Sequence, residues 1–536
     1  MRASAFPCPC RLDGCQLNGH ALPFAHSVGR WAFSVLITLL GAVAVGPACG
    51  VGAQPVAPTM AREIDRTRFE ITTFAKGLAY PTSMATLDDG SLLVAESQGG
   101  TTWIAHDIWG STRGSLVRLV DANHDGVADG APQVLADYLP GIVSSVRRVD
   151  NTIFALSSQA GKETITILQS GSTPTSVLTT IGTIKFSFPT TPVQFEHTTY
   201  ALAARAATTG GVDLYFNVGS QYNSVGTAAN KTVGLSLGGS AAFAGSAVTS
   251  AQMAADSIQM VHVDVAGGTL SVSTPHTIAV GLRNAAGMVF DDGGNLYFED
   301  NGFDNGNTSL SADTLHVIEA SSLGKTVPNF GFANTYIDYA TGATVGPTAG
   351  IVPPLAAFRP VDGKKSEGAV ELAFAPEMFP YEFWGKIFVP FSGKYGQGGL
   401  ANDENPLVLV DPASGSLFHF IENQQLGHGN GMLATDDTLY LSDLNFWGGF
   451  GGTSDGVPAD QGGVVYAVRV LPAYAVPEPA TGVLIVVAAA TWLAVGVRSG
   501  RGLARGPGKP REKAPMTGGK SLLNWPPARF GGVRWL

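Results

Sequence analysis

The sequence predicts an all-β fold, and within that class a six-bladed β-propeller. Glycine is frequent (68 of 536 residues), 45% of the residues are hydrophobic and only 14% are charged, which is typical of many short strands joined by tight turns around a sizeable core. One pattern also recurs: turn residues, then an apolar strand rich in aromatic or β-branched residues, then a polar exit. It begins at Asp88, Asp150, Gly210, Asp292, Phe383 and Asp436.

The spacing of these repeats suits propeller blades of four strands that are lengthened by loops. Stacking the blades around a channel buries the faces that one blade cannot bury alone. The polar exits are then expected to meet on one face, where small-molecule sites form. A β-sandwich with coincidental hairpins is the alternative.

The chain ends predict an exported protein. Residues 1–53 resemble an export signal, since Arg30 precedes the apolar run 31–45 and small residues follow up to Ala53. All four cysteines precede the expected mature start, so we expect neither disulfides nor thiolate metal sites in the body, 64–470. Cys49 could alternatively mark a lipoprotein site. The net charge of -10 and pI near 5.5 argue against a nucleic-acid partner.

The C-terminal region differs from the body in composition. Pro477-Glu478-Pro479 opens the segment 476–499, whose apolar stretch 480–497 is just long enough to span a bilayer as a transmembrane helix. A basic tail, 500–536, follows and is expected to be disordered and to stay cytoplasmic. The segment resembles a PEP-CTERM sorting signal. That resemblance implies a membrane exosortase as partner and the cell surface as destination.

The stretch 280–318 is expected to form a hairpin that opens onto a binding edge. Arg283 and Asn284 precede its first strand, and a polar loop follows its second. One hairpin thus brings a guanidinium, amides and carboxylates to one side of the scaffold. The polar residues that leave the second strand are Glu299, Asp300, Asn301, Asp304 and Asp313.

A second acidic loop runs from Asp121 to Asp129. Oxygen-bearing side chains alternate along it, and Gly126 permits a sharp turn, which suits a hard cation such as calcium. Pro132 stands where a complete loop needs a bidentate glutamate. The loop is therefore either a structural calcium site or a plain solvated turn. Its expected ligands are Asp121, Asn123, Asp125 and Asp129.

The body resembles the glucose/sorbosone dehydrogenase family, soluble six-bladed propellers that use pyrroloquinoline quinone (PQQ). The resemblance is diffuse over 69–470. It is densest at Gly281-Leu-Arg-Asn284, Asp292-Gly-Gly-Asn-Leu-Tyr297, Phe379-Pro-Tyr-Glu-Phe-Trp384 and Asp437-Thr-Leu-Tyr-Leu-Ser-Asp443. It implies a PQQ-dependent dehydrogenase that oxidises a sugar hydroxyl and binds calcium.

The resemblance also implies roles for single residues. His197 takes the place of the general base, while Arg283 and Asn284 match the quinone contacts and Lys394 could meet the quinone carboxylates. Gly302 and Phe303 would offer backbone carbonyls to calcium, with Asp313 as a side-chain ligand or orienter. Ser220 stands where the family has the aspartate that orients the base.

These residues have structural alternatives, and so does the function. His197 could be a hydrogen-bonded structural histidine, and Arg283 could pair with a carboxylate across the channel. The first functional hypothesis is the PQQ-dependent sugar dehydrogenase. The second is a non-catalytic surface propeller that binds carbohydrate or protein in the extracellular matrix, and Ser220 favours this second hypothesis.

Overall fold

The computed structural model describes residues 64–474 except 99–107, 109–110, 160, 240, 246–247, 267–268, 306–307, 361–364, 395–396, 423–425, 447–461 and 473. The described residues all belong to the unit Val51–Leu536. The predicted export signal, sorting segment and basic tail lie outside them. Within the described part, no helix is both long and apolar enough to cross a bilayer.

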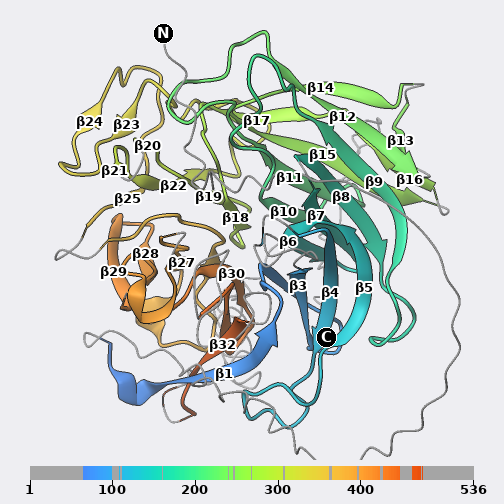
Figure 1. The fold of residues 1–536 in the computed structure, drawn as a ribbon, viewed down its shortest axis with the longest axis vertical. Helices are drawn as coiled ribbons and strands as arrows, with labels where there is room; N and C mark the ends of the chain where they lie inside the picture. Colours follow the sequence, from blue (N-terminus) through green and yellow to red (C-terminus); the bar gives the residue numbers. More distant parts are fainter. Residues whose placement is uncertain are drawn as a thin grey trace, which may run out of the picture. The chain divides into compact units, whose positions relative to one another are not determined.

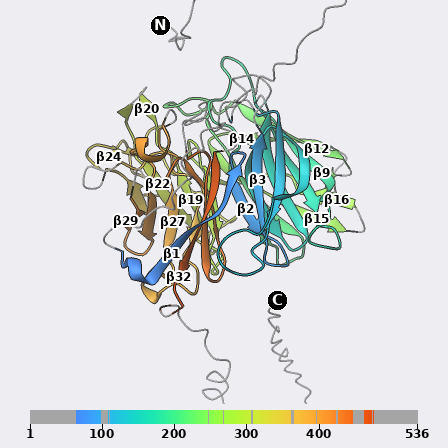
Figure 2. The same ribbon diagram turned by 60° about the horizontal axis from the view of Figure 1, so that its bottom comes forward.

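The described residues form an all-β six-bladed propeller, as the repeats predict (Figure 1). The six sheets follow one another around the ring in sequence order, so the colours pass once around Figure 1. The tilted view shows the blades standing side by side (Figure 2).

The first three blades take up the N-terminal half of the ring. Blade 1 consists of β2 (Ser83–Thr86), β3 (Leu92–Gln98), β4 (Arg113–Leu119) and β5 (Gln133–Pro140). Blade 2 consists of β6 (Ile142–Val149), β7 (Thr152–Gln159), β8 (Lys162–Gln169) and β9 (Thr179–Ser187), extended by β12 (Thr232–Gly239) and β14 (Ser250–Ala254). Blade 3 contains β10 (Leu202–Ala206), β11 (Val212–Val218), β15 (Ser257–Ala266), β16 (Thr269–Val272), β13 (Ala242–Phe243) and β17 (His276–Val280).

The other three blades complete the ring. Blade 4 consists of β18 (Gly287–Phe290), β19 (Leu296–Asp300), β22 (Asp313–Ile318) and β25 (Ala356–Phe358), with two added hairpins, β20 (Asp304–Asn305) with β21 (Thr308–Ser309) and β23 (Tyr336–Ile337) with β24 (Thr344–Val345). Blade 5 consists of β26 (Ala373–Phe374), β27 (Ile387–Pro390), β28 (Leu407–Asp411) and β29 (Ser416–Ile421). Blade 6 consists of β30 (Gly429–Ala434), β31 (Thr438–Asp443), β32 (Gly463–Val470) and β1 (Phe69–Leu78). Short 3-10 turns lie at Arg66–Arg68, Tyr381–Phe383 and Gly399–Ala401.

The six sequence repeats are the second strands of the six blades: β3, β7, β11, β19, β27 and β31. We call the side on which the second strands end, and on which the innermost strands begin, the upper face. The opposite side is the lower face. The polar exits therefore do meet on one face of the ring.

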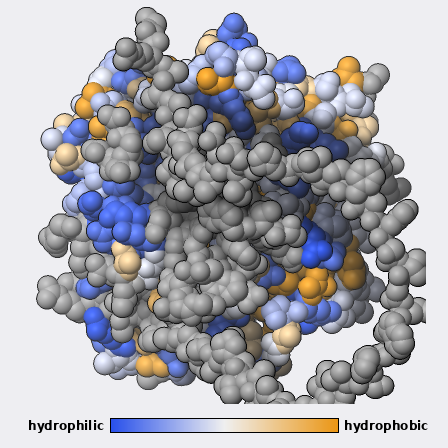
Figure 3. Space-filling view, in the orientation of Figure 1, coloured by the Kyte–Doolittle hydropathy of each residue, from blue (hydrophilic) through white to orange (hydrophobic). Residues whose placement is uncertain are grey.

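The hydrophobic core is divided among the interfaces between blades. Each of the six interfaces has its own cluster of buried side chains, such as Phe154 and Phe216 between blades 2 and 3. A ring of six blades has six interfaces, so this distribution closes the circle. The described surface seen in Figure 3 mixes hydrophilic and hydrophobic residues, as expected once the larger apolar side chains are buried.

The segment 223–252 differs from its expected form. Its Gly, Ala and Ser content predicts an inserted loop, but β12 pairs with β9 and β14 pairs with β12. The exposed edge of a four-stranded blade leaves backbone N–H and C=O groups free to pair with a further strand. The segment therefore widens blade 2 to six strands.

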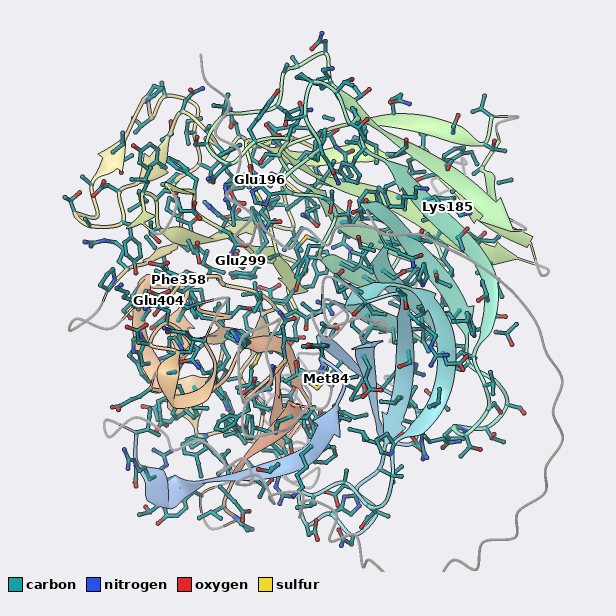
Figure 4. All side chains as sticks on the ribbon, in the orientation of Figure 1. Met84, Lys185, Glu196, Glu299, Phe358 and Glu404 are labelled. Atoms are coloured by element: carbon teal, nitrogen blue, oxygen red, sulfur yellow. The ribbon has the colours of Figure 1, made fainter. Side chains whose placement is uncertain are left out.

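One buried carboxylate links four blades near the axis. Glu371, just before β26, accepts hydrogen bonds from the Ser83 hydroxyl (2.7 Å), from Nη1 of Arg147 (2.8 Å) and from the backbone N–H of Met432 (3.1 Å). Its side chain is 2% exposed. Below it, the lower face holds a cavity of about 1010 Å³ lined by Met84, Met288 and Met432 among others. Figure 4 shows Met84 and Glu299 toward the middle of the ring and Lys185 toward its rim.

Replacing Glu371 with alanine is expected to destabilise the protein by about 3–5 kcal/mol, because Arg147 would keep a largely buried charge without its partner. Urea unfolding measures this loss. The matched control is Glu382→Ala, which removes a more exposed ion pair with Arg68 and should cost no more than about 1 kcal/mol. Equal effects of the two substitutions would contradict the role given to Glu371.

Candidate functional site

On the upper face, polar residues at the ends of second strands hold the segments that lead into innermost strands. Glu96 accepts the N–H of Ala79 (2.9 Å), and Asn217 accepts those of Tyr200 (2.7 Å) and Ala201 (2.9 Å). In blade 6, Asp443 accepts N–H groups from Gly427 (2.6 Å) and His428 (2.8 Å) in the same way. The polar side chains at the ends of the second strands therefore satisfy buried backbone N–H groups.

Blade 4 uses two acids for this purpose. Glu299 accepts the N–H of Ala286 (2.6 Å), and Asp300 accepts those of Arg283 (3.0 Å) and Asn284 (2.6 Å). Burial raises the pKa of Asp300 to about 7 and that of Glu299 well above its usual range. Asp300 thus fixes the backbone of the Arg283–Asn284 pair that the sequence singles out.

The Arg283 guanidinium is buried and already bonded. Its Nε donates to the carbonyl of Asn223 (2.9 Å) and its Nη2 to the Asn223 side chain (2.7 Å). Asn284 donates to Asn301 (2.9 Å), whose amide reaches Glu299 (3.0 Å). Burial lowers the Arg283 pKa, while the four carboxylates around it, Asp300, Asp304, Asp313 and Glu196, raise it. The surroundings of this cation are therefore strongly acidic.

His197 lies beside Arg283, although the two residues are distant in sequence. The N–H of His197 donates to the carbonyl of Ser220 (3.0 Å), and the N–H of Ser220 donates to the carbonyl of Arg283 (2.9 Å). Gly219 permits this packing, because a Cβ there would come within 2.8 Å of the His197 Cβ. The blade 3 and blade 4 loops thus bring an imidazole and a guanidinium to one place on the upper face.

The His197 ring has no acid to orient it among the described contacts. Its Nε2 is buried and makes no hydrogen bond with a described residue. Burial, followed by the Arg283 charge, lowers its pKa to about 3, so the ring is neutral at physiological pH. The Ser220 hydroxyl donates to the carbonyl of Tyr222 (2.7 Å) and not to the ring. A base of such low pKa is a weak proton acceptor, but its free nitrogen can bond to a ligand.

The predicted calcium residues near this site are in contact, but their oxygens already accept hydrogen bonds. The Asp313 carboxylate accepts the N–H groups of Gly302 (2.7 Å), Gly368 (2.8 Å) and Ala369 (3.0 Å). The Phe303 carbonyl accepts those of Leu310 (3.0 Å) and Ser311 (3.1 Å). Burial raises the Asp313 pKa to about 6. This arrangement does not fit a calcium ion, which needs several free oxygen ligands.

The other predicted ligands are also engaged. Lys394, in the β27–β28 loop, pairs with Asp403 and with Glu404 (3.5 Å). With Arg283 bonded and surrounded by acids, the upper face as arranged does not fit the carboxylates of PQQ. Across the described residues, no group of three or more His, Cys, Asp or Glu side chains is arranged to hold a metal.

The loop from Asp121 to Asp129 joins β4 to β5 within blade 1. Asp121 accepts the N–H groups of Asp125 (3.1 Å) and Gly126 (2.9 Å), and Asp129 accepts that of Ala122 (2.7 Å). Asn123 donates to Asp125 (3.0 Å), and Arg469 of β32 donates to the Asp125 carbonyl (2.7 Å). The contacts are those of a self-capped turn held by Arg469, and calcium binding here stays a prediction.

Several solved structures have a fold similar to that of this chain. The sequence itself matches no protein-family model and no curated protein. Solved structures similar to it include the PQQ domain of pyranose dehydrogenase from Coprinopsis cinerea in its holo form (15% identity, 78% of this chain, 99% of that chain, TM-score 0.49). Another is the calcium structure of Trichoderma reesei carbohydrate-active enzymes family AA12 (13% identity, 78% of this chain, 98% of that chain, TM-score 0.48). A third is the PQQ-bound aldose sugar dehydrogenase from Streptomyces coelicolor (14% identity, 75% of this chain, 99% of that chain, TM-score 0.45). The six-bladed assignment rests on the strand pairing described above.

Several residues that build the site were missed from the sequence. Asn223, which holds Arg283, lies in a segment whose composition indicates a loop. The Asn430 side-chain amide donates to the Tyr200 hydroxyl across the ring (3.2 Å). Tyr200 precedes β10, and Asn430 lies at the start of β30. Nothing in their local sequence marks these positions, because each acts through a partner far away in the chain.

The low pKa of His197 predicts a pH-dependent stability. Between pH 6.5 and about 3 the unfolded chain takes up a proton at this residue and the folded chain does not, so the free energy of unfolding falls as the pH falls. The loss is about 1.4 kcal/mol per pH unit for one such group. In His197→Gln the slope of unfolding free energy between pH 4 and 6 should be shallower by this amount. The exposed His276→Gln should leave the slope unchanged, and equal slopes in all three proteins would show that His197 titrates normally.

Proposed function

We propose that the upper face binds a neutral, hydroxyl-rich small molecule of the sugar class. The observation that carries this proposal is the buried Nε2 of His197, which has no described partner and lies beside Arg283. A buried polar atom without a partner costs about 1–3 kcal/mol, and a ligand hydroxyl would remove that cost. The position, on the upper face of a propeller at the starts of innermost strands, is a usual one for small-molecule sites.

The charges around the site select the kind of ligand. Arg283 has four carboxylates nearby, and its Nε and Nη2 already donate hydrogen bonds to Asn223. An anionic ligand would therefore meet more negative than positive charge, whereas a neutral polyol would not. A neutral imidazole and the surrounding amides can both donate to and accept from hydroxyl groups.

A second candidate function is oxidation of the bound sugar hydroxyl with PQQ, as in the family that the sequence resembles. The observation that favours it is the contact between the His197 segment and Arg283, the residues assigned to base and quinone contact. The Ser220 hydroxyl, which is turned to Tyr222, and the engaged oxygens of Asp313 and Phe303 favour the binding protein.

The location belongs to the same proposal. We infer export through the N-terminal signal and attachment to the membrane through residues 480–497, with sorting to the surface. Cell fractionation of the full chain and of a chain ending at Tyr474 tests this, since only the full chain should sediment with membranes.

Sugar binding is testable by calorimetry with neutral aldoses and the matching uronic acids. The neutral sugar should bind at least about tenfold more tightly than its carboxylate counterpart, because of the acidic surroundings. His197→Ala should weaken binding of the neutral sugar about tenfold, the worth of one hydrogen bond. His276→Ala, at an exposed position, is the control and should bind as the wild type does. Tighter binding of the uronic acid would contradict the proposal.

The second candidate is tested by adding PQQ and calcium to the purified protein and following sugar-dependent dye reduction. We expect the rate to equal that of His197→Ala, because the base lacks an orienting acid and the calcium oxygens are engaged. Dye reduction that is clearly above background, and that His197→Ala abolishes, would establish the dehydrogenase in place of the binding protein.

A further inference from the structure

A pocket in blade 4 lies next to the Arg283 segment. Two segments between β19 and β25 lie outside the four-stranded sheet of the blade. The first is the β20–β21 hairpin, and the second follows β22 and contains the β23–β24 hairpin. We call these two segments the excursion. The space between this excursion and the blade is a pocket of about 120 Å³. Most of its walls are carbon, from residues such as Phe330, Phe332 and Ile351, but Arg283 and Asp300 also line it.

One polar side chain in this wall is left without a full set of partners. His316, on β22, is 4% exposed, and its Nε2 lies 2.8 Å from the Thr314 hydroxyl. Its Nδ1 is buried and has no described hydrogen-bond partner. The ring is held in place because it stacks on Phe298 (5.3 Å between centroids, 22°) and meets the Phe330 ring edge-on (4.8 Å, 70°).

The pocket is large enough for an organic ring. The Thr335 hydroxyl in its wall already donates to the Pro347 carbonyl (2.5 Å). An apolar cavity of about 150 Å³ is known to accept benzene, so a pocket of 120 Å³ has room for a ring of that order. The uncompensated nitrogen calls for a ligand that also carries one hydrogen-bonding group.

We propose that this pocket binds a small cyclic molecule bearing one hydroxyl group, of the phenol or cyclic alcohol class. Its ring packs between Phe330 and the side chains of the excursion. Its hydroxyl bonds to Nδ1 of His316, as donor or acceptor according to the tautomer set by Thr314. The ring is fixed by Phe298 and Thr314, so little ordering is needed on binding. The pocket shares Arg283 and Asp300 with the surroundings of the proposed sugar site, but neither His197 nor Asn223 lines it.

The test compares phenol with benzene as probes on the full-length protein, by titration calorimetry or ligand-observed NMR. The quantity of interest is the ratio of the two affinities, which cancels the general gain from burying a ring. In His316→Leu the phenol-to-benzene ratio should fall about tenfold relative to the wild type, as expected for one lost hydrogen bond to a buried group. The exposed His276→Leu is the matched control and should leave the ratio unchanged.

A second variant guards against misfolding of the first. Val352→Phe places a larger side chain in the pocket and should abolish binding of both probes, while circular dichroism and the melting temperature show that the blade still folds. Failure of both probes to bind the wild type overturns the proposal. So does a phenol-to-benzene ratio that is the same in wild type and His316→Leu. Sugar binding is measured in the same samples, so its presence or absence is read separately.

Discussion

The ring depends on the bonds that one carboxylate makes at its centre. Glu371 accepts from Ser83, Arg147 and Met432, so residues of four blades meet at its two oxygens. Hydrophobic packing between neighbouring blades is tolerant of small shifts, but hydrogen bonds to a buried charge are directional and costly to lose. Glu371 therefore sets how the innermost strands stand relative to one another, and the segments that begin those strands carry His197 and Arg283.

The acidic residues of the upper face show how a structural need can look like a functional site. Asp300, Asp313 and Asp443 have raised pKa values because they are buried, and shifted carboxylates often mark catalysis. Here each accepts two or more backbone N–H groups from a loop that leads into an innermost strand. In every blade the chain turns sharply in the loop that leads into the innermost strand. The backbone N–H groups of that loop have no partner in a sheet, so they need other acceptors.

The sequence predicted the ring because its signal is local: a turn, a buried second strand and a polar exit recur in each blade. It also located the blade 4 hairpin, β18 with β19, with the Arg283–Asn284 pair before its first strand. Contacts between distant segments could not be read in this way. Nothing near Asn223 shows that it will hold Arg283, and nothing near Lys394 shows that Asp403 and Glu404 will neutralise it. The strands β12 and β14 were missed for a related reason, since an edge strand needs a neighbour more than it needs a strongly apolar composition.

Blade 6 takes its outer strand from the start of the propeller and the other three from its end. β1 pairs with β32 from Phe69 opposite Val470 to Leu78 opposite Gly463, so almost the whole body separates the two partners in sequence. Closing so long a loop is slow, although the extra entropy grows only with the logarithm of its length. The early part of a growing chain thus cannot complete the circle, and the protein reaches its final form only after its last strand has been synthesised.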